Sequence, residues 1–145
     1  MMHDMDFVVR LLGEADTITA SKIDIREQQS VVNACLKYKN TCAFVRGVSA
    51  MPKTYPFSVG YEAIFEHAAV RYYEDGYPDG KKQTKLELFC DETRREIPLG
   101  QTECYENVIR YVLQCLKDGQ VSCLDIREAI RTLKTVLDMN EELGK

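Results

Sequence analysis

Residues 30–50, SVVNACLKYKNTCAFVRGVSA, decide the fold that we predict from this sequence. Apolar side chains recur at every second position from Val32 to Tyr38, which places them on one face of a β-strand spanning residues 30–38. The pair Lys39-Asn40 favours a turn, and a second strand-like run follows over residues 41–50. A two-residue connection joins antiparallel neighbours, so the stretch predicts a β-hairpin.

Similar runs extend on both sides of this hairpin. We predict further strands over residues 17–25, 57–67, 69–74, 84–90 and 94–98. Turn-forming residues separate several of them, namely Asp75-Gly76 with Asp79-Gly80, and Asp91-Glu92-Thr93. These connections are short enough to join antiparallel neighbours, so the sequence predicts a meandering antiparallel sheet.

Helical patterns occupy the two ends of the chain. Residues 2–12 carry apolar side chains at helical spacing, and Gly13 follows as an expected left-handed cap. A second apolar stripe lies between Val108 and Leu116, and Gly119 is placed to end that helix. Ser122 and Asp125 have the spacing of a capping box, which predicts the start of a last helix at Ser122.

The last helix carries an apolar stripe that we expect to face the core. Its residues are Ile126, Ala129, Ile130, Leu133, Val136, Leu137 and Asn140. In this interpretation its solvated face carries the charged residues Arg127, Glu128, Arg131 and Lys134.

Strands in one block between helices predict a single α+β domain over residues 1–145, with a predominantly antiparallel β-sheet and helices packed on one face. Val31 and Cys35 lie on the other face of their strand, so that face is partly apolar. Neither face is cleanly polar, and two helices can cover only one of them. A monomer seldom exposes a large continuous apolar surface, so we expect the face that the helices leave open to be used for dimerisation with a second copy of the chain. The alternative is a larger, more curved sheet that folds over itself.

The charge balance excludes several classes of partner. The chain has 19 Lys and Arg against 23 Asp and Glu, a formal charge of -4, and no basic run, so nucleic acid is not an expected partner. Residues 1–6 lack the basic and apolar regions of a secretion signal, and no apolar run approaches the roughly 18 residues that span a membrane. We therefore expect a cytoplasmic protein that does not contact a membrane.

The cysteines and histidines do not predict a metal site. Six cysteines lie inside apolar periodic segments, so buried reduced thiols are a better interpretation than disulfides. No two cysteines have the C-x-x-C spacing, and His3 and His67 are the only imidazoles. His67 lies near the end of an apolar strand, where we expect a partly buried structural histidine.

The segment from His3 to Gly13, HDMDFVVRLLG, resembles the H-D-x-D helix that opens the C-terminal domain of the glucose-fructose oxidoreductase / inositol dehydrogenase (Gfo/Idh/MocA) family. Residues 55–58 (YPFS) and 105–109 (YENVI) are also similar to elements of that family, whose order matches nearly the whole chain. The resemblance implies a parent protein in which an N-terminal Rossmann domain binds NAD or NADP. It further implies that the C-terminal domain supplies a wall of the substrate pocket and the dimer interface.

The same resemblance implies which residues form the site. His3 matches the family's catalytic histidine, and Asp6 matches a position that often contacts a substrate hydroxyl. The partner aspartate would fall before Met1, and the catalytic lysine belongs to a Glu-Lys-Pro motif that this chain lacks. An imidazole with a pKa of about 6.5 suits removal of the hydroxyl proton while hydride leaves to the nicotinamide.

None of the eight glycines forms a G-x-G-x-x-G motif, so we expect no cofactor to bind this chain. The expected function is that of the C-terminal substrate-binding and dimerisation domain of an NAD(P)-dependent oxidoreductase acting on a sugar, polyol or related hydroxyl compound. The missing Rossmann domain would belong to the same longer polypeptide, and the chain alone would be inactive.

Simpler explanations of the same residues stay open at this point. Asp4 and Asp6 lie in a first helical turn, where carboxylates oppose the positive end of the helix dipole, so capping explains both without a substrate. His3 lies so near the terminus that a surface position also explains it. The alternative function is a free-standing, non-catalytic module for dimerisation or small-ligand binding.

Overall fold

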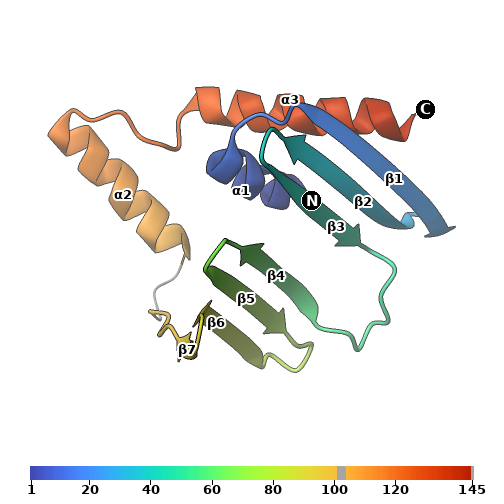
Figure 1. The fold of residues 1–145 in the computed structure, drawn as a ribbon, viewed down its shortest axis with the longest axis horizontal. Helices are drawn as coiled ribbons and strands as arrows, with labels where there is room; N and C mark the ends of the chain where they lie inside the picture. Colours follow the sequence, from blue (N-terminus) through green and yellow to red (C-terminus); the bar gives the residue numbers. More distant parts are fainter. Residues whose placement is uncertain (101–103, 145) are drawn as a thin grey trace. The chain divides into compact units, whose positions relative to one another are not determined.

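The computed structural model describes residues 1–100 and 104–144 (Figure 1). Its contacts gather into two compact units: unit 1 combines Met1–Ala50 with Tyr105–Lys145, and unit 2 is Met51–Cys104. Along the described chain the elements follow in the order α1, β1 to β7, α2 and α3. These helices and antiparallel strands confirm the predicted α+β class, whereas one domain over residues 1–145 stays a prediction.

The predicted hairpin is the centre of unit 1. β1 (Thr17–Arg26), β2 (Gln29–Tyr38) and β3 (Thr41–Val48) form an antiparallel sheet in that order. β2 and β3 pair as far as Tyr38↔Thr41, so the two-residue turn lies at Lys39-Asn40, as predicted.

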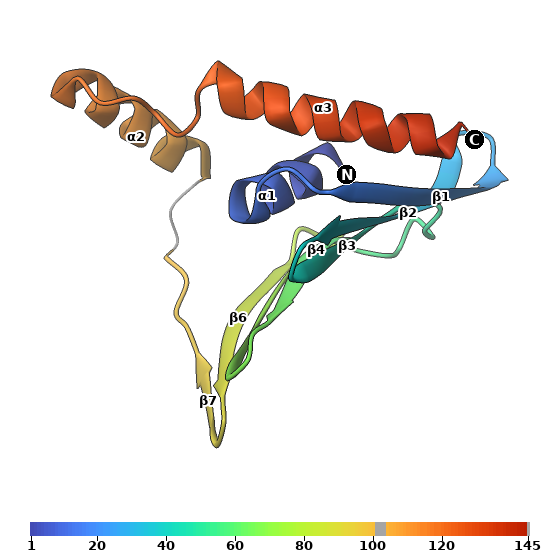
Figure 2. The ribbon, with the colours of Figure 1, turned by 45° about the horizontal axis from the view of Figure 1, so that its top comes forward.

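Two helices cover one face of this sheet. α1 (Met2–Leu12) contacts β3, α3 (Ile126–Leu143) contacts β1, and the two helices pack against each other (Figure 2). The buried core between the helices and the sheet consists of Met5, Ala34, Leu36, Val45 and Met139. Ala34 and Leu36 are alternate residues of β2, so they lie on the same face of the strand, and the structure shows that the helices cover this face.

Two of the helices end at glycines with positive φ. Gly13 follows α1 at φ +80° and ψ -160°, and its N–H donates to the carbonyl of Val9. The sign of φ agrees with the prediction, but this ψ lies outside the left-handed helical region, so the cap is of another type. α2 (Cys104–Asp118) is followed by Gly119, whose φ of +63° is the value that a left-handed cap requires.

The start of α3 differs from the prediction. Asp125, and not Ser122, is the N-cap, because its carboxylate accepts hydrogen bonds from the backbone N–H groups of Arg127 and Glu128. The Ser122 hydroxyl instead accepts from the N–H of Leu124, which forms a local turn. One carboxylate thus satisfies two free N–H groups at the positive end of the helix.

The buried face of α3 is also not the predicted one. Thr132, Thr135 and Met139 are only 3–5% exposed. Of the aliphatic residues that we expected in the core, Val136 is partly buried against it as predicted. Four others are exposed instead: Ile126 (72%), Ile130 (57%), Leu133 (45%) and Leu137 (53%). The prediction was wrong for these four because periodicity locates an apolar stripe on a helix but does not identify the surface that the stripe meets.

Unit 2 contains a second antiparallel sheet. β4 (Phe57–Ile64), β5 (Ala68–Gly76), β6 (Lys82–Cys90) and β7 (Thr93–Glu96) pair in chain order. The meander is therefore confirmed, but the described strands form two sheets and not the single sheet of the prediction. Hairpins depend on local turns that the sequence displays, whereas division into sheets depends on long-range contacts.

Gly60 in β4 marks a close approach of two strands. A Cβ atom at this position would lie 2.9 Å from the backbone carbonyl oxygen of Tyr72 in β5. Backbone cannot move aside as the end of a flexible side chain can, so we expect Gly60→Ala to lower the free energy of unfolding by about 1–3 kcal/mol. Urea denaturation would measure the loss.

Gly76→Ala in β5 is the matched control for this substitution. Its added Cβ would have its nearest neighbour at 3.8 Å, which is an ordinary van der Waals contact. A similar loss of stability in both variants would contradict the steric explanation.

Candidate functional site

The residues that the sequence singled out lie on α1 in unit 1. His3 and Asp6 are three residues apart, so they lie one turn apart on the helix, and Arg10 continues the same face. His3 is exposed to solvent. The Asp6 side chain is partly exposed (36%) and faces α3 through its hydrogen bond to Thr132.

Both carboxylate oxygens of Asp6 have partners within the chain. Thr132 Oγ1 donates to Asp6 Oδ1 at 2.8 Å, and Arg10 Nε donates to Asp6 Oδ2 at 2.9 Å. Arg10 Nη1 in turn donates to the carbonyl of Cys123 at 2.9 Å. These bonds link α1 to α3 and to the segment before α3. Asp6 thus bonds to side chains and not to free helix N–H groups, so it is not the helix cap that the simpler explanation proposed.

The electrostatics keep Asp6 ionised. Partial burial raises the pKa of Asp6, but hydrogen bonds from Thr132 and Arg10 and the nearby charges of Arg10 and His3 outweigh burial, and the net pKa lies below its usual value. The hydrogen bond to Asp6 correspondingly raises the pKa of Arg10. A carboxylate has about four lone-pair sites, so Asp6 can still accept a hydrogen bond from a ligand hydroxyl.

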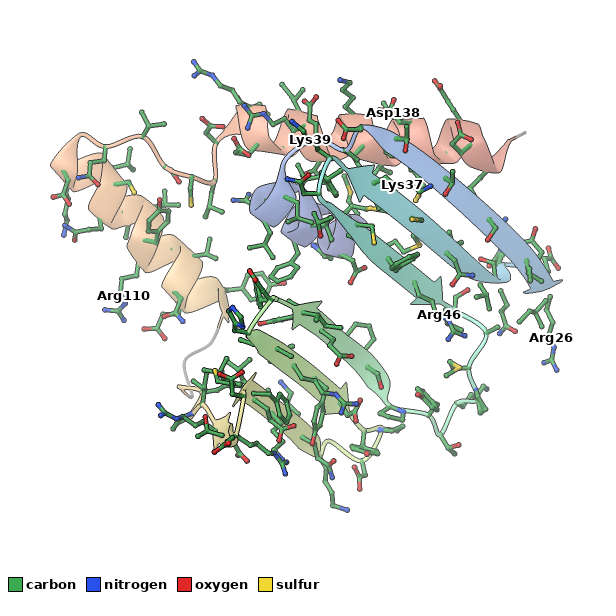
Figure 3. All side chains as sticks on the ribbon, in the orientation of Figure 1. Arg26, Lys37, Lys39, Arg46, Arg110 and Asp138 are labelled. Atoms are coloured by element: carbon green, nitrogen blue, oxygen red, sulfur yellow. The ribbon has the colours of Figure 1, made fainter. Side chains whose placement is uncertain are left out.

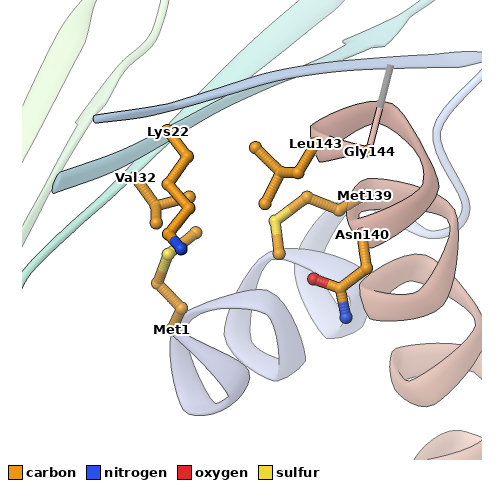
Figure 4. Close-up of a pocket in the computed structure, with 7 residues that line it drawn as sticks. All are labelled: Met1, Lys22, Val32, Met139, Asn140, Leu143 and Gly144. Atoms are coloured by element: carbon orange, nitrogen blue, oxygen red, sulfur yellow. The ribbon is translucent and has the colours of Figure 1, made fainter. Parts of the chain in front are cut away.

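A cavity in unit 1 lies apart from these residues. It has a volume of about 510 Å³ and is open to solvent, and its lining residues are Met1, Lys22, Val32, Met139, Asn140, Leu143 and Gly144 (Figure 4). Neither His3 nor Asp6 lines this cavity. The sequence contained no signal for it, because its walls come from the two ends of the chain and from the middle of two strands.

Unit 2 carries a polar cluster that the sequence analysis missed. Glu87 in β6 is 5% exposed, accepts hydrogen bonds from Arg94 and forms an ion pair with Lys85 at 3.1 Å. The hydrogen bond from Arg94, and then that from Lys85, lowers the pKa of Glu87. Lys85 and Arg94 each pair with Glu87, so ion pairing between neighbouring strands explains this cluster without a bound ligand.

His67 is not the partly buried residue that we expected. Its side chain is 78% exposed, and Nε2 lies 3.6 Å from a carboxylate oxygen of Glu66. The predicted strand over residues 57–67 ends at Ile64, because the N–H of Phe65 turns back to the carbonyl of Ala68. His67 therefore lies in a connection between strands, where an imidazole stays in solvent.

Other candidate sites do not form in the part of the chain that the structure describes. Residues 1–100 and 104–144 contain no group of three His, Cys, Asp or Glu side chains that could hold a metal ion. Cys35, Cys42, Cys90, Cys115 and Cys123 are free thiols, and the side chain of Cys104 lies outside the description. None of the described helices combines the length and the apolar character that crossing a bilayer requires.

The chain matches no protein-family model and no curated protein at a significant level. It does match solved structures of longer proteins. UDP-N-acetylglucosamine 3-dehydrogenase GnnA from Acidithiobacillus ferrooxidans matches in two crystal forms, with TM-scores of 0.80 and 0.74 and identities of 14% and 15%. Biliverdin reductase from Synechocystis sp. PCC 6803, solved with biliverdin and NADP+, matches with a TM-score of 0.64 and 14% identity.

These matches cover 99% of this chain and 45% of each of the longer chains. The chain therefore spans less than half the length of the solved proteins that it matches. At identities of 14–15% the matches establish the fold. This chain has the α+β fold that forms 45% of the dehydrogenase GnnA and of this biliverdin reductase.

Proposed function

We propose that this chain is the C-terminal substrate-binding and dimerisation domain of an NAD(P)-dependent oxidoreductase that acts on a sugar, polyol or related hydroxyl compound. The observation that carries this proposal is the fold, which spans 99% of this chain and only 45% of a UDP-N-acetylglucosamine dehydrogenase at a TM-score of 0.80. In such a protein, the part of the chain outside this fold would bind the dinucleotide cofactor. The H-D-x-D helix of the Gfo/Idh/MocA family resembles α1, which supports the same proposal.

In this proposal α1 contributes the residues that touch the substrate. His3 is exposed and would accept the proton of the substrate hydroxyl, as an imidazole can do. Asp6 is held ionised by Thr132 and Arg10 and would accept a hydrogen bond from a second hydroxyl. A bound nicotinamide would supply the hydride-accepting chemistry.

The residues of this chain do not fit the cofactor itself. A dinucleotide needs closely spaced glycines before a helix N-terminus, and none of the eight glycines here stands in a G-x-G-x-x-G motif. Every step that involves the nicotinamide would therefore depend on a nucleotide-binding domain in the same polypeptide.

We expect the isolated chain to bind neither NAD nor NADP and to show no dehydrogenase activity. Calorimetric titration of the purified chain with each dinucleotide tests this. The reason is the missing phosphate-binding loop together with the missing Glu-Lys-Pro lysine. A dissociation constant in the micromolar range for either dinucleotide would overturn the assignment of the chain to the substrate-binding half.

The size of the native protein separates this proposal from the alternative of a free-standing, non-catalytic module. Intact mass spectrometry of the protein from its own cell is the direct measurement. A much heavier chain with G-x-G-x-x-G and Glu-Lys-Pro in its additional sequence supports the oxidoreductase. A native mass near 16.6 kDa would favour the free-standing module.

The proposal includes a homodimer formed through the open face of the β1–β2–β3 sheet, in a cytoplasmic protein. By register this face carries Cys35, Phe44 and Arg46, opposite the face that Ala34, Leu36 and Val45 turn toward the helices. Figure 3 labels Lys37 and Arg46, which lie on the same face, two residues along their strands from Cys35 and Phe44. Phe44 is 78% exposed, as an interface anchor in an unpaired protomer would be.

A further inference from the structure

Two of the free cysteines lie where the chain leaves α2 and continues toward α3 (Figure 1). Cys115 lies in the last turn of α2, and Cys123 lies in the connection of residues 119–125. Cys115 is 6% exposed, although its neighbours at positions 113, 114, 116 and 117 are exposed. Cys123 is exposed to solvent. One thiol of this pair is therefore sheltered and the other is accessible.

The side chain of Tyr111 links the two cysteines. Its hydroxyl oxygen accepts a hydrogen bond from the backbone N–H of Cys123, with an N–O distance of 3.1 Å. Cys115 follows Tyr111 by four residues on α2, so their side chains lie on the same face of the helix, one turn apart. Cys123 is therefore held against the face of α2 that carries Cys115.

The position of Cys123 is also fixed from α1, and its side chain reaches the same hydroxyl as that of Cys115. Arg10 Nη1 donates to the carbonyl oxygen of Cys123 at 2.9 Å. The hydrogen bond from the Cys123 N–H lowers the pKa of Tyr111. Interactions of the hydroxyl with the side chains of Cys123 and Cys115, together with burial, outweigh this effect and raise the pKa above its usual value.

This arrangement is that of thiols that are oxidised reversibly. Burial as a small apolar side chain explains Cys115, but it does not explain the exposed Cys123 beside it. An accessible thiol with a second thiol next to it is the usual form of a redox-sensing site. In cytosolic proteins, disulfides are mostly transient bonds of this type.

We propose that Cys115 and Cys123 are a redox-active pair that hydrogen peroxide converts to a disulfide between α2 and the connection to α3. The thiolate of Cys123 attacks one peroxide oxygen, the O–O bond breaks, and a sulfenic acid and one water form. The sulfur of Cys115 then attacks the sulfur of Cys123, so that the S–S bond forms, the S–O bond breaks and a second water leaves. The two thiols lose two electrons and two protons, which reduce the peroxide to water. This pair does not depend on the proposed oxidoreductase function.

The first experiment is peptide mapping of the chain after exposure to hydrogen peroxide and alkylation of the remaining thiols. Trypsin separates the two cysteines into the adjacent peptides 111–117 and 118–127. We expect these peptides to be joined, with the loss of two hydrogen atoms, and to separate on reduction. Cys42→Ser is the matched control, because Cys42 is an exposed thiol in β3 and its removal should leave the joined peptides unchanged.

The second experiment tests the folded arrangement. Equilibration with a glutathione redox buffer measures the equilibrium constant for disulfide formation. Tyr111→Phe keeps the ring but removes the hydroxyl that holds Cys123, so the constant should fall about two- to tenfold. Tyr55→Phe is the control, because Tyr55 is 47% exposed and Tyr111 is 39% exposed. Circular dichroism should show that both variants are folded.

Several results would overturn the pair. Free Cys115 and Cys123 after oxidation would do so, as would Cys123 joined only to glutathione or to a second copy of the chain. An equilibrium constant that is unchanged in Tyr111→Phe would contradict the role of the hydroxyl. A constant that is equally high in urea would contradict the folded arrangement, because two cysteines eight residues apart would then pair by chain flexibility alone.

Discussion

Leu36→Ala is expected to lower the free energy of unfolding by about 2–5 kcal/mol, the largest loss that we expect from one substitution in this chain. Leu36 in β2 is 0% exposed and lies with Met5 in the core between the sheet and the helices. Truncation removes apolar burial and leaves a cavity that the surrounding structure closes only in part. The free energy of unfolding of a typical domain is about 5–15 kcal/mol, so this loss would be a large fraction of the total stability.

Urea denaturation measures this loss, and Leu11→Ala is the control. Leu11 on α1 is 63% exposed, so its truncation should change stability by no more than about 0.5 kcal/mol. Hydrogen exchange should also become faster in β1, β2 and β3 of the Leu36→Ala variant. Equal small changes in the two variants would show that unit 1 does not have its core at Leu36.

Asp6→Ala is expected to lower the free energy of unfolding by about 1–2 kcal/mol with no substrate present. The substitution removes the acceptor for Thr132 and Arg10, and it leaves the Thr132 hydroxyl, in a residue only 3% exposed, without that partner. The Asp6 side chain is 36% exposed, so solvent weakens its pairing with Arg10 and keeps the loss below that of a deeply buried pair.

A double-mutant cycle with Thr132→Val would confirm that the two residues act together. Because Asp6→Ala and Thr132→Val break the same hydrogen bond, their combined loss should be smaller than the sum of the single losses. Additive losses would show that Asp6 does not hold α1 against α3. In that case a role in contacting a ligand would be the remaining reason for its position.

The same carboxylate predicts a dependence of stability on pH. The folded protein lowers the pKa of Asp6, so its stabilising contribution is complete above the unfolded pKa of about 3.9 and is lost as the pH falls through the folded pKa. The asparagine of the Asp6→Asn variant cannot ionise, so the variant lacks this contribution at every pH. The difference in free energy of unfolding between the unsubstituted protein and the variant should therefore become smaller as the pH falls from 7 to 3. Urea denaturation at both values measures this difference.

Local structure could be predicted from the sequence to within a few residues. The β2–β3 turn at Lys39-Asn40 and the end of α2 before Gly119 are as predicted, because turns and helix ends depend on the conformational preferences of two or three adjacent residues. The residues that share a face of β2 could also be predicted, since alternation along a strand separates its two faces, but the sequence did not indicate which face the helices cover. The cap at Asp125 was missed because two polar residues near the start of α3 could both serve as caps.

The candidate site could be predicted only in part. The sequence singled out His3 and Asp6, and the structure places both on the same side of α1. It did not indicate that Asp6 bonds to Thr132, which is 126 residues away in the chain. No pattern in the sequence joins two positions so far apart, because their contact exists only when α3 packs beside α1.

What the sequence determined by itself is the class of the fold and the order of its elements, because apolar periods and turn residues act over a few neighbouring positions. The tertiary structure alone decided that the described strands form two sheets, that Thr132 and Thr135 are buried in α3, and that the stripe around Leu133 faces solvent. An amphipathic helix lowers its free energy against any apolar surface. Which surface it meets depends on the packing of distant segments, and here β1 and α1 contact the face of Thr132, Thr135 and Met139 and leave the residues around Leu133 exposed.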